Sequence, residues 1–98
     1  MRREIIFAPE AILDLKRLSA RDRSILRDAI ERHLRHEADR VSGSRIKRLR
    51  GLSQPQYRLR VEGFRVFYDV SDDTVEVLAV VPKSATGAWL DEMGKAKE

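Results

Sequence analysis

QYRLRVEGFRVFYDV, the stretch from Gln56 to Val70, decides the fold of this 98-residue chain. Two segments rich in valine, tyrosine and phenylalanine flank the pair Glu62-Gly63. In both segments an apolar or aromatic residue occurs at every second position. This pattern predicts a β-hairpin with a two-residue turn, in which Gly63 supplies the permissive backbone.

The turn also fixes the register of the expected hairpin. If Val61 lies opposite Phe64, alternate residues of both strands project from one face. We expect this face to join the core, and it carries Tyr57, Leu59, Val61, Phe64, Val66, Tyr68 and Val70. The period of two places every other residue of the hairpin on the opposite face.

Three arginines share that opposite face. In this register Arg58 lies opposite Phe67, and Arg60 lies opposite Arg65. Like charges that face each other across two strands are unfavourable. Since the guanidinium fork matches phosphate, the arrangement predicts that an anion binds there.

Composition limits the class of protein. The length fits one domain, and 42% hydrophobic with 37% charged residues is typical of a globular chain. No apolar run approaches the roughly 20 residues of a membrane span, and Met1 to Glu4 does not lead into a signal-peptide core. Cysteine is absent, which excludes disulfides, thiolate metal sites and a cysteine nucleophile. We expect a cytoplasmic protein without a membrane partner.

The positive charge is concentrated in one segment. Between residues 40 and 65 there are eight basic residues and one acidic residue, a net charge of +7, which leaves −3 for the rest of a chain whose total is +4. The basic residues are Arg40, Arg45, Lys47, Arg48, Arg50, Arg58, Arg60 and Arg65. Such segregation favours a polyanionic partner, although residues 40–50 alone are equally typical of a solvated basic loop.

The first half of the chain predicts a strand followed by two helices. Arg3 to Phe7 is β-prone, and apolar residues at helical spacing follow from Pro9 to Leu18. Ser19 to Asp22 has the shape of a capping box, which starts a second helix that runs to about Glu37 or Ala38. Two successive helices of this kind predict a helical hairpin.

The second half predicts strands and loops. Arg45 to Arg50 fits an ordered basic loop or a short strand, and Gly51 to Pro55 is rich in turn formers. After the central hairpin, Thr74 to Val81 predicts a strand, and Lys83 to Gly87 predicts a loop. We expect Asp91 to Glu98 to be a frayed charged tail.

Uninterrupted alternation along the strand Thr74 to Val81 would divide its side chains between the two faces. Val75, Val77, Ala79 and Val81 would face the core, and Glu76, Leu78 and Val80 would share the arginine face. The element order β-α-α-(β)-β-β-β then predicts an α+β fold. In it an antiparallel sheet carries the helical hairpin on one face and leaves a basic face open.

Several motifs together resemble the RelE/ParE superfamily of bacterial toxin–antitoxin systems. They are the helical hairpin after a first strand, Lys47-Arg48-Leu49-Arg50-Gly51, Tyr57-Arg58-Leu59-Arg60-Val61, and Gly63-Phe64-Arg65-Val66-Phe67-Tyr68. The similarity extends to about Leu90, so it implies one RelE-like domain over residues 1–90 and a tail over residues 91–98. For the RelE branch it implies ribosome-dependent cleavage of mRNA in the decoding site.

The resemblance also implies site residues. The RelE pattern has basic residues at the outward positions of the strand, here Arg58 and Arg60, and an arginine in the Gly-aromatic-Arg element, here Arg65. A basic residue near the end of the last strand and an aromatic hydroxyl six positions later correspond to Lys83 and Trp89. Tryptophan departs from that pattern, because it stacks and donates from its indole nitrogen but has no phenol for proton transfer.

Cleavage of this kind requires no metal or cofactor. The 2′-hydroxyl loses its proton, the phosphorane is stabilised and the leaving 5′-oxygen is protonated. Arg58 and Arg65 suit the phosphorane, whereas an arginine is a poor base. Lys83 suits proton transfer if it is desolvated. His33 and His36 lie three apart on the second helix without further ligands, so we expect a structural role for both.

Other basic and apolar residues predict contacts with partners. Phosphate contacts with mRNA and the ribosome are expected from Arg45, Lys47, Arg48 and Arg50. Phe67, Leu78 and Val80 would form an exposed apolar strip beside the arginines, partly covered by Trp89-Leu90. An acidic, amphipathic antitoxin segment would fit this strip and give a toxin–antitoxin hetero-oligomer.

Two alternatives to the ribonuclease stay open. One is a ParE-like toxin that binds DNA gyrase, a class that needs no basic catalytic cluster. The other is a nucleic-acid-binding homologue without catalysis. Trp89 favours this alternative, because it stands where the superfamily pattern has an aromatic hydroxyl.

Overall fold

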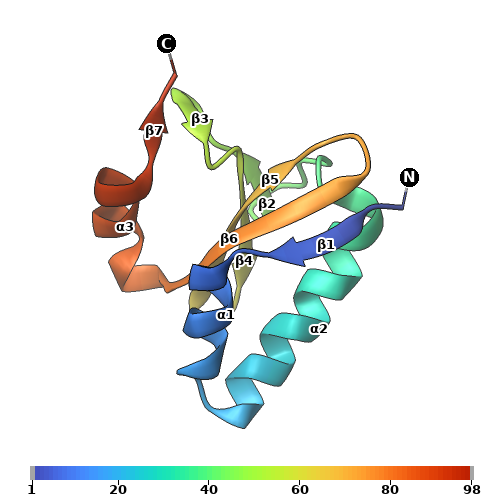
Figure 1. Cartoon of the computed structure of the whole chain (residues 1–98), viewed down its shortest axis with the longest axis vertical. Coiled ribbons are helices and arrows are strands. Elements are labelled where there is room, and N and C mark those ends of the chain that lie inside the picture. The colour runs from blue at the N-terminus through green and yellow to red at the C-terminus, as the bar shows by residue number, and fades with distance from the viewer. Residues whose placement is uncertain (1, 98) are drawn as a thin grey trace.

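A five-stranded sheet and a helical hairpin form two packed layers (Figure 1). The strands are β1 (Glu4–Phe7), β2 (Ile46–Arg48), β4 (Tyr57–Val61), β5 (Phe64–Val70) and β6 (Thr74–Pro82), and their order in the sheet is β1-β6-β5-β4-β2. β1 runs parallel to β6 and the other pairs are antiparallel. This computed structural model describes residues 2–97; Met1 and Glu98, the outer ends of the expected domain and tail, lie outside the described residues. The predicted α+β class is confirmed.

The helical hairpin consists of α1 (Pro9–Lys16) and α2 (Ala20–Glu37). Pro9 lies in the first turn of α1, where its missing amide costs nothing. The Ser19 hydroxyl accepts a hydrogen bond from the Asp22 amide at 3.1 Å and so caps α2, as the sequence predicted. The apolar stripes of both helices pack on the sheet and enclose the main core. Its buried residues include Ala11, Leu15, Leu26, Ile30, Leu34, Leu59, Val66, Tyr68, Val75 and Val77.

The central hairpin has the predicted register. Val61 pairs with Phe64 and Arg60 pairs with Arg65, and the pairing continues regularly to the far end of β4. The turn differs in one detail, because the residue with positive φ is Glu62, at 52°, and not Gly63. We expected the glycine to adopt the permissive backbone, and that expectation was wrong.

β6 changes face at Leu78, which the sequence analysis did not predict. Phe67 pairs with Ala79 and Tyr68 with Val77, so Leu78 is left without a partner in a β-bulge. Beyond the bulge the alternation is inverted. Val80 therefore belongs to the main core, while Ala79 and Val81 pack on the other side of the sheet. The expectation that Ala79 and Val81 face the main core was wrong.

The C-terminal segment is more ordered than expected. Lys83–Ala85 forms a 3₁₀ turn that leads into the helix α3 (Thr86–Met93), where we had expected a loop as far as Gly87 and a frayed tail from Asp91. A short strand β7 (Lys95–Ala96) then pairs with β3 (Leu52–Gln54), which lies in the segment expected to be turns. Residues 91–97 thus continue the fold instead of fraying from it. Figure 1 shows α3 and β7 on the side of the sheet away from the helical hairpin.

Candidate nucleic-acid interface

Three neighbouring strands place cations on the sheet face opposite the helical hairpin. We call Arg58, Arg60 and Arg65 the arginine cluster. Arg60 pairs directly with Arg65 across β4 and β5. Lys47 of β2 pairs with Arg58 and therefore projects from the same face. The structure thus joins Lys47 to the cluster, whereas the sequence grouped it with the basic loop.

Arg65 is a buried cation without a carboxylate partner among residues 2–97. Only 8% of its surface is exposed. Its Nη1 donates to the carbonyl oxygens of Glu62 at 3.0 Å and of Phe64 at 2.8 Å. These bonds orient the guanidinium but leave its charge uncompensated, and a buried charge is costly unless an opposite charge pairs with it. An anionic ligand would supply that opposite charge.

Arg58 is half-buried beside Arg65. Its Nη2 donates to the Ser44 carbonyl at 2.7 Å, and its Nε is buried without a hydrogen-bond partner in the described part of the chain. Burial lowers the pKa of Arg58, and the nearby charges of Arg65 and Arg60 lower it further. Both effects disfavour the charged form and would be relieved by an anion between the guanidiniums.

The arginine face is only partly open, because α3 covers its apolar side. The Trp89 ring stacks on Phe67 with centroids 4.7 Å apart and an interplanar angle of 7°. Phe67 is consequently 1% exposed, and Ala79 and Val81 are buried in the same cluster. The predicted covering of this patch by Trp89 and Leu90 is present in the structure.

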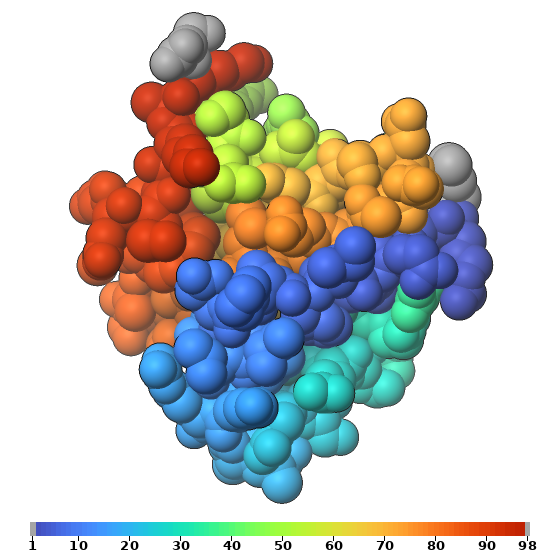
Figure 2. Space-filling view, viewed as in Figure 1, coloured from blue at the N-terminus to red at the C-terminus, as the bar shows by residue number. Residues whose placement is uncertain are grey.

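The exposed apolar strip expected beside the arginines does not form. Phe67 lies beneath Trp89, and Val80 is 5% exposed because the bulge turns it into the main core. Leu78 alone of the three reaches a surface cavity, of about 200 Å³, lined also by Trp89, Met93 and residues near the start of α1. In Figure 2 this region lies where β6 is visible between α1 and the α3–β7 segment.

Lys83 directly follows β6 and lies beside the turn of the central hairpin. Its amide donates to the Gly63 carbonyl at 2.8 Å, and its side chain is exposed at the start of the 3₁₀ turn. Pro82, the preceding residue, pairs with Phe64 next to Arg65. The chain position of Lys83 is therefore close to the arginine cluster, whereas its surroundings leave it solvated.

The basic loop residues do not act as one group. Arg48 pairs with Tyr57, a residue of the core side, and its guanidinium lies 4.9 Å from the centroid of the Tyr57 ring. Arg48 thus projects from the face opposite Lys47. Arg45 extends toward α2, where its Nη1 donates to His33 Nε2 at 3.1 Å. Arg50 is exposed in the loop before β3.

His33 accepts that hydrogen bond in its neutral form, because an arginine only donates. Burial lowers the pKa of His33, and the charges of Arg45 and Arg32 add to this effect. Among residues 2–97, no three metal-ligating side chains come together. Within the same residues, none of the helices has the length and apolar character needed to cross a bilayer.

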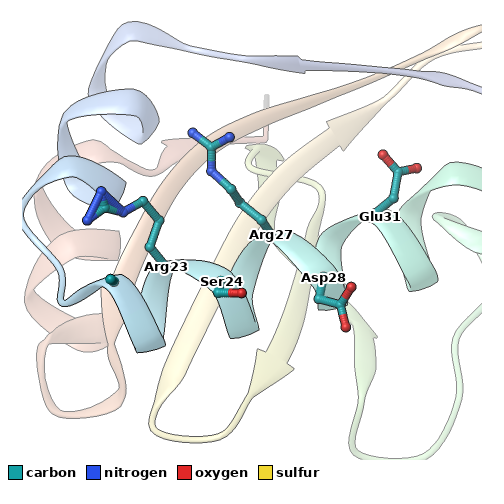
Figure 3. A pocket seen from close by; sticks show the side chains of 6 residues that line it. Arg23, Ser24, Arg27, Asp28 and Glu31 are labelled. Atoms are coloured by element: carbon teal, nitrogen blue, oxygen red, sulfur yellow. The ribbon is translucent and has the colours of Figure 1, made fainter.

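A surface hollow of about 760 Å³ lies away from the arginine cluster. It lies along α2, and its lining includes Arg23, Arg27, Asp28 and Glu31 (Figure 3). Both basic and acidic side chains line this hollow, and α2 packs on the other face of the sheet. We therefore place the candidate site at the arginine cluster, where the charge has one sign.

Solved structures of toxins from toxin–antitoxin systems have the same fold as this chain. The toxin–antitoxin complex RelBE2 from Mycobacterium tuberculosis aligns with a TM-score of 0.69 and 25% sequence identity, over 84% of this chain and 99% of that chain. The free E. coli toxin RelE aligns with a TM-score of 0.67 and 23% identity, over 95% and 99% of the two chains. The YoeB dimer from Staphylococcus aureus aligns with a TM-score of 0.61 and 21% identity, over 83% and 97%. No curated protein matches the chain.

The sequence itself matches one family model. Its description is "ParE toxin of type II toxin-antitoxin system, parDE", and the match covers residues 5–85. That range includes the helical hairpin, the arginine cluster and Lys83. The chain therefore belongs to the ParE toxin family, within the RelE/ParE superfamily of type II toxin–antitoxin systems.

Proposed function

We propose that this toxin is a ribosome-dependent mRNA endonuclease that inhibits translation. The observation that carries the proposal is the buried guanidinium of Arg65, which has no carboxylate partner in residues 2–97 and shares its face with Arg58, Arg60 and Lys47. A stable fold that keeps this charge uncompensated is suited to a phosphate ligand. RelE-like folds among its structural relatives agree with this reading.

In the proposed reaction the scissile phosphate lies between Arg58 and Arg65. The 2′-hydroxyl attacks phosphorus as it loses its proton, the bond to the 5′-oxygen breaks, and that oxygen gains a proton. Arg65, fixed by two carbonyls, stabilises the extra negative charge of the phosphorane. Lys83 is the candidate for proton transfer, a role that requires the covering RNA and ribosome to exclude water from it. The chemistry needs no cofactor.

Trp89 takes no part in proton transfer in this proposal. Its ring is stacked on Phe67 and its indole offers only one N–H donor. It closes the apolar side of the site and leaves the cationic side free for RNA. The role given to it by the superfamily pattern therefore becomes one of shaping the site.

We also propose an antitoxin partner that neutralises the cluster. Several structural relatives are toxin–antitoxin complexes, from Mycobacterium tuberculosis, Methanococcus jannaschii and E. coli. An acidic segment would place carboxylates on Arg58 and Arg65 and an apolar side chain in the cavity beside Leu78. The hetero-oligomer would then act in the cytoplasm, where ribosomes and mRNA are available.

Binding to DNA gyrase is the second candidate function. The observation that favours it is the ParE family match over residues 5–85. A toxin that acts as a protein ligand of gyrase needs no cluster of uncompensated arginines, so Arg58 and Arg65 favour the ribonuclease instead. The two activities have different targets and can be measured side by side.

The test uses the purified chain in two assays. In a reconstituted translation reaction, primer extension on the mRNA should reveal new 5′ ends within codons, and only when ribosomes are present. In parallel, DNA supercoiling by gyrase should be unchanged. Inhibition of supercoiling without mRNA cleavage would reject the proposal in favour of the gyrase ligand, and absence of both effects would leave a non-catalytic homologue.

A further inference from the structure

A row of cations leads away from the arginine cluster toward α2. Arg65 pairs with Arg60 across the hairpin. The Arg60 amide donates to the Arg45 carbonyl at 2.8 Å, so these two residues are held side by side. Arg45 in turn donates to His33 of α2. Each step is a direct pairing or hydrogen bond, which makes the row continuous over β5, β4, the turn before β2, and α2.

The row ends in a groove between β4 and α2. The groove has a volume of about 480 Å³. Its charged or titratable lining residues are Asp28, Arg32, His33, Arg45, Arg60 and Glu62. Asp28 is paired with Arg32 at 3.5 Å, but both side chains are largely exposed, so the pair is weak and Arg32 can bind a phosphate instead. Arg45 and Arg60 form no ion pair with a described residue of the chain, so their charges are available to a ligand.

We infer that single-stranded RNA leaving the arginine cluster passes over Arg60 and enters this groove, where Arg45 and Arg32 contact its phosphates. The inference rests on the proposed function, because it extends the path of the same RNA. Successive phosphates of a strand require successive cations, and neighbouring strands of the sheet supply them about 4.8 Å apart. The helix α2 thereby becomes part of the RNA surface, although it packs on the other face of the sheet.

His33 is a positioning residue in this path. Its neutral Nε2 accepts from the Arg45 guanidinium at 3.1 Å and restrains a side chain that is otherwise exposed. An arginine held in one place loses less conformational freedom when it binds a phosphate. Replacing His33 with leucine, which cannot accept a hydrogen bond, should therefore weaken RNA binding without removing a charge.

The experiment measures the affinity of an unstructured RNA of about 12 nucleotides by fluorescence anisotropy between about 50 and 200 mM salt. Each lost phosphate contact with a single strand lowers the slope of log K against log salt by about 0.7. Arg45→Ala and Arg32→Ala should each show this reduction. Arg27→Ala is the matched control, since Arg27 lines the neighbouring hollow of α2 (Figure 3) and not the groove, and should keep the native slope.

The outcomes separate the inference from the proposed function. If Arg58→Ala weakens binding but Arg45→Ala and Arg32→Ala behave like Arg27→Ala, the RNA path is wrong and the groove is left for an acidic protein segment. If the native chain binds no RNA, the path is wrong, and the cleavage assay with ribosomes decides the ribonuclease proposal separately. Unchanged circular dichroism of the variants excludes misfolding as the cause; Arg27, Arg32 and Arg45 are exposed, whereas Arg58 is half-buried.

Discussion

Asp14 of α1 accepts a hydrogen bond from the backbone amide of Val80, with 3.0 Å between Oδ2 and the amide nitrogen. β1 pairs with β6 only as far as Val77, so beyond that residue this edge of β6 has no neighbouring strand. The carboxylate supplies the acceptor that a neighbouring strand would otherwise provide, and it fixes the segment of β6 just beyond the bulge to α1. This hydrogen bond joins the helical hairpin to the part of β6 whose Ala79 and Val81 pack with α3 on the other face.

Asp14→Ala should therefore destabilise the fold. The part-buried Val80 amide would lose its acceptor, which costs about 1 to 3 kcal/mol. Urea denaturation followed by circular dichroism measures the change. Asp28→Ala is the matched control, because the Asp28 side chain is 77% exposed and its removal should stay within about 0.5 kcal/mol. Equal stabilities of the two variants would show that the fold does not depend on the hydrogen bond of Asp14.

Arg65 and Arg60 should differ in their effects on stability, although they face each other. Arg65→Ala removes the donor from two carbonyls at the turn and should cost about 1 to 2 kcal/mol. Arg60 is exposed, so Arg60→Ala should be neutral or slightly stabilising through relief of like-charge repulsion. Thermal unfolding of both variants tests this difference, and a larger loss for Arg60→Ala would contradict it.

Trp89 should tolerate another aromatic ring. Trp89→Phe keeps an apolar ring over Phe67, so α3 should stay in place and mRNA cleavage should remain close to native. Trp89→Ala exposes Phe67 and should lower the melting temperature. A strong loss of cleavage in Trp89→Phe, with an unchanged melting temperature, would instead assign the indole nitrogen a role in the reaction.

His33 makes the stability depend on pH. Its pKa in the folded protein is lowered, chiefly by burial, so the unfolded chain with a pKa of about 6.5 binds more protons. The contribution of neutral His33 to the free energy of unfolding is therefore complete above about pH 6.5, and it is lost as the pH falls below that value. The charged groups near the His33 ring include the cations Arg32, Arg45 and Arg60 and the acids Asp28, Glu37 and Glu62.

The measurement compares denaturation of the native chain with that of His33→Gln between about pH 7 and pH 5, the range in which histidine titrates. The native chain should lose stability more steeply, because glutamine does not titrate while the carboxylates are common to both. Parallel pH profiles would show that His33 has the same pKa in the folded and unfolded states.

The sequence was sufficient to predict the elements that are specified by neighbouring residues, through the spacing of apolar side chains and through turn or cap residues. The hairpin register followed from Glu62-Gly63, and the start of α2 followed from Ser19. The bulge at Leu78 could not be read from β6 alone, because valine and alanine occur there on both faces. Asp14, which accepts the hydrogen bond just beyond the bulge, is distant in sequence.

The candidate site was predicted in part for the same reason. Arg58, Arg60 and Arg65 lie within one hairpin, so their common face was visible in the sequence. Lys47 and Arg48 are adjacent and equally basic, and only the pairing of β2 with β4 places them on opposite faces. The helix α3 was missed because its apolar residues are few and its stability depends on the stack of Trp89 with Phe67.

The most direct test of the ribonuclease proposal is the rate of mRNA cleavage at saturating ribosome. Arg58→Ala and Arg65→Ala should reduce this rate by about 100-fold or more, as expected for groups that stabilise a transition-state charge. Arg48→Ala removes a neighbouring charge on the opposite face and should cleave at nearly the native rate. Equal rates for all three variants would contradict the catalytic role of the arginine cluster.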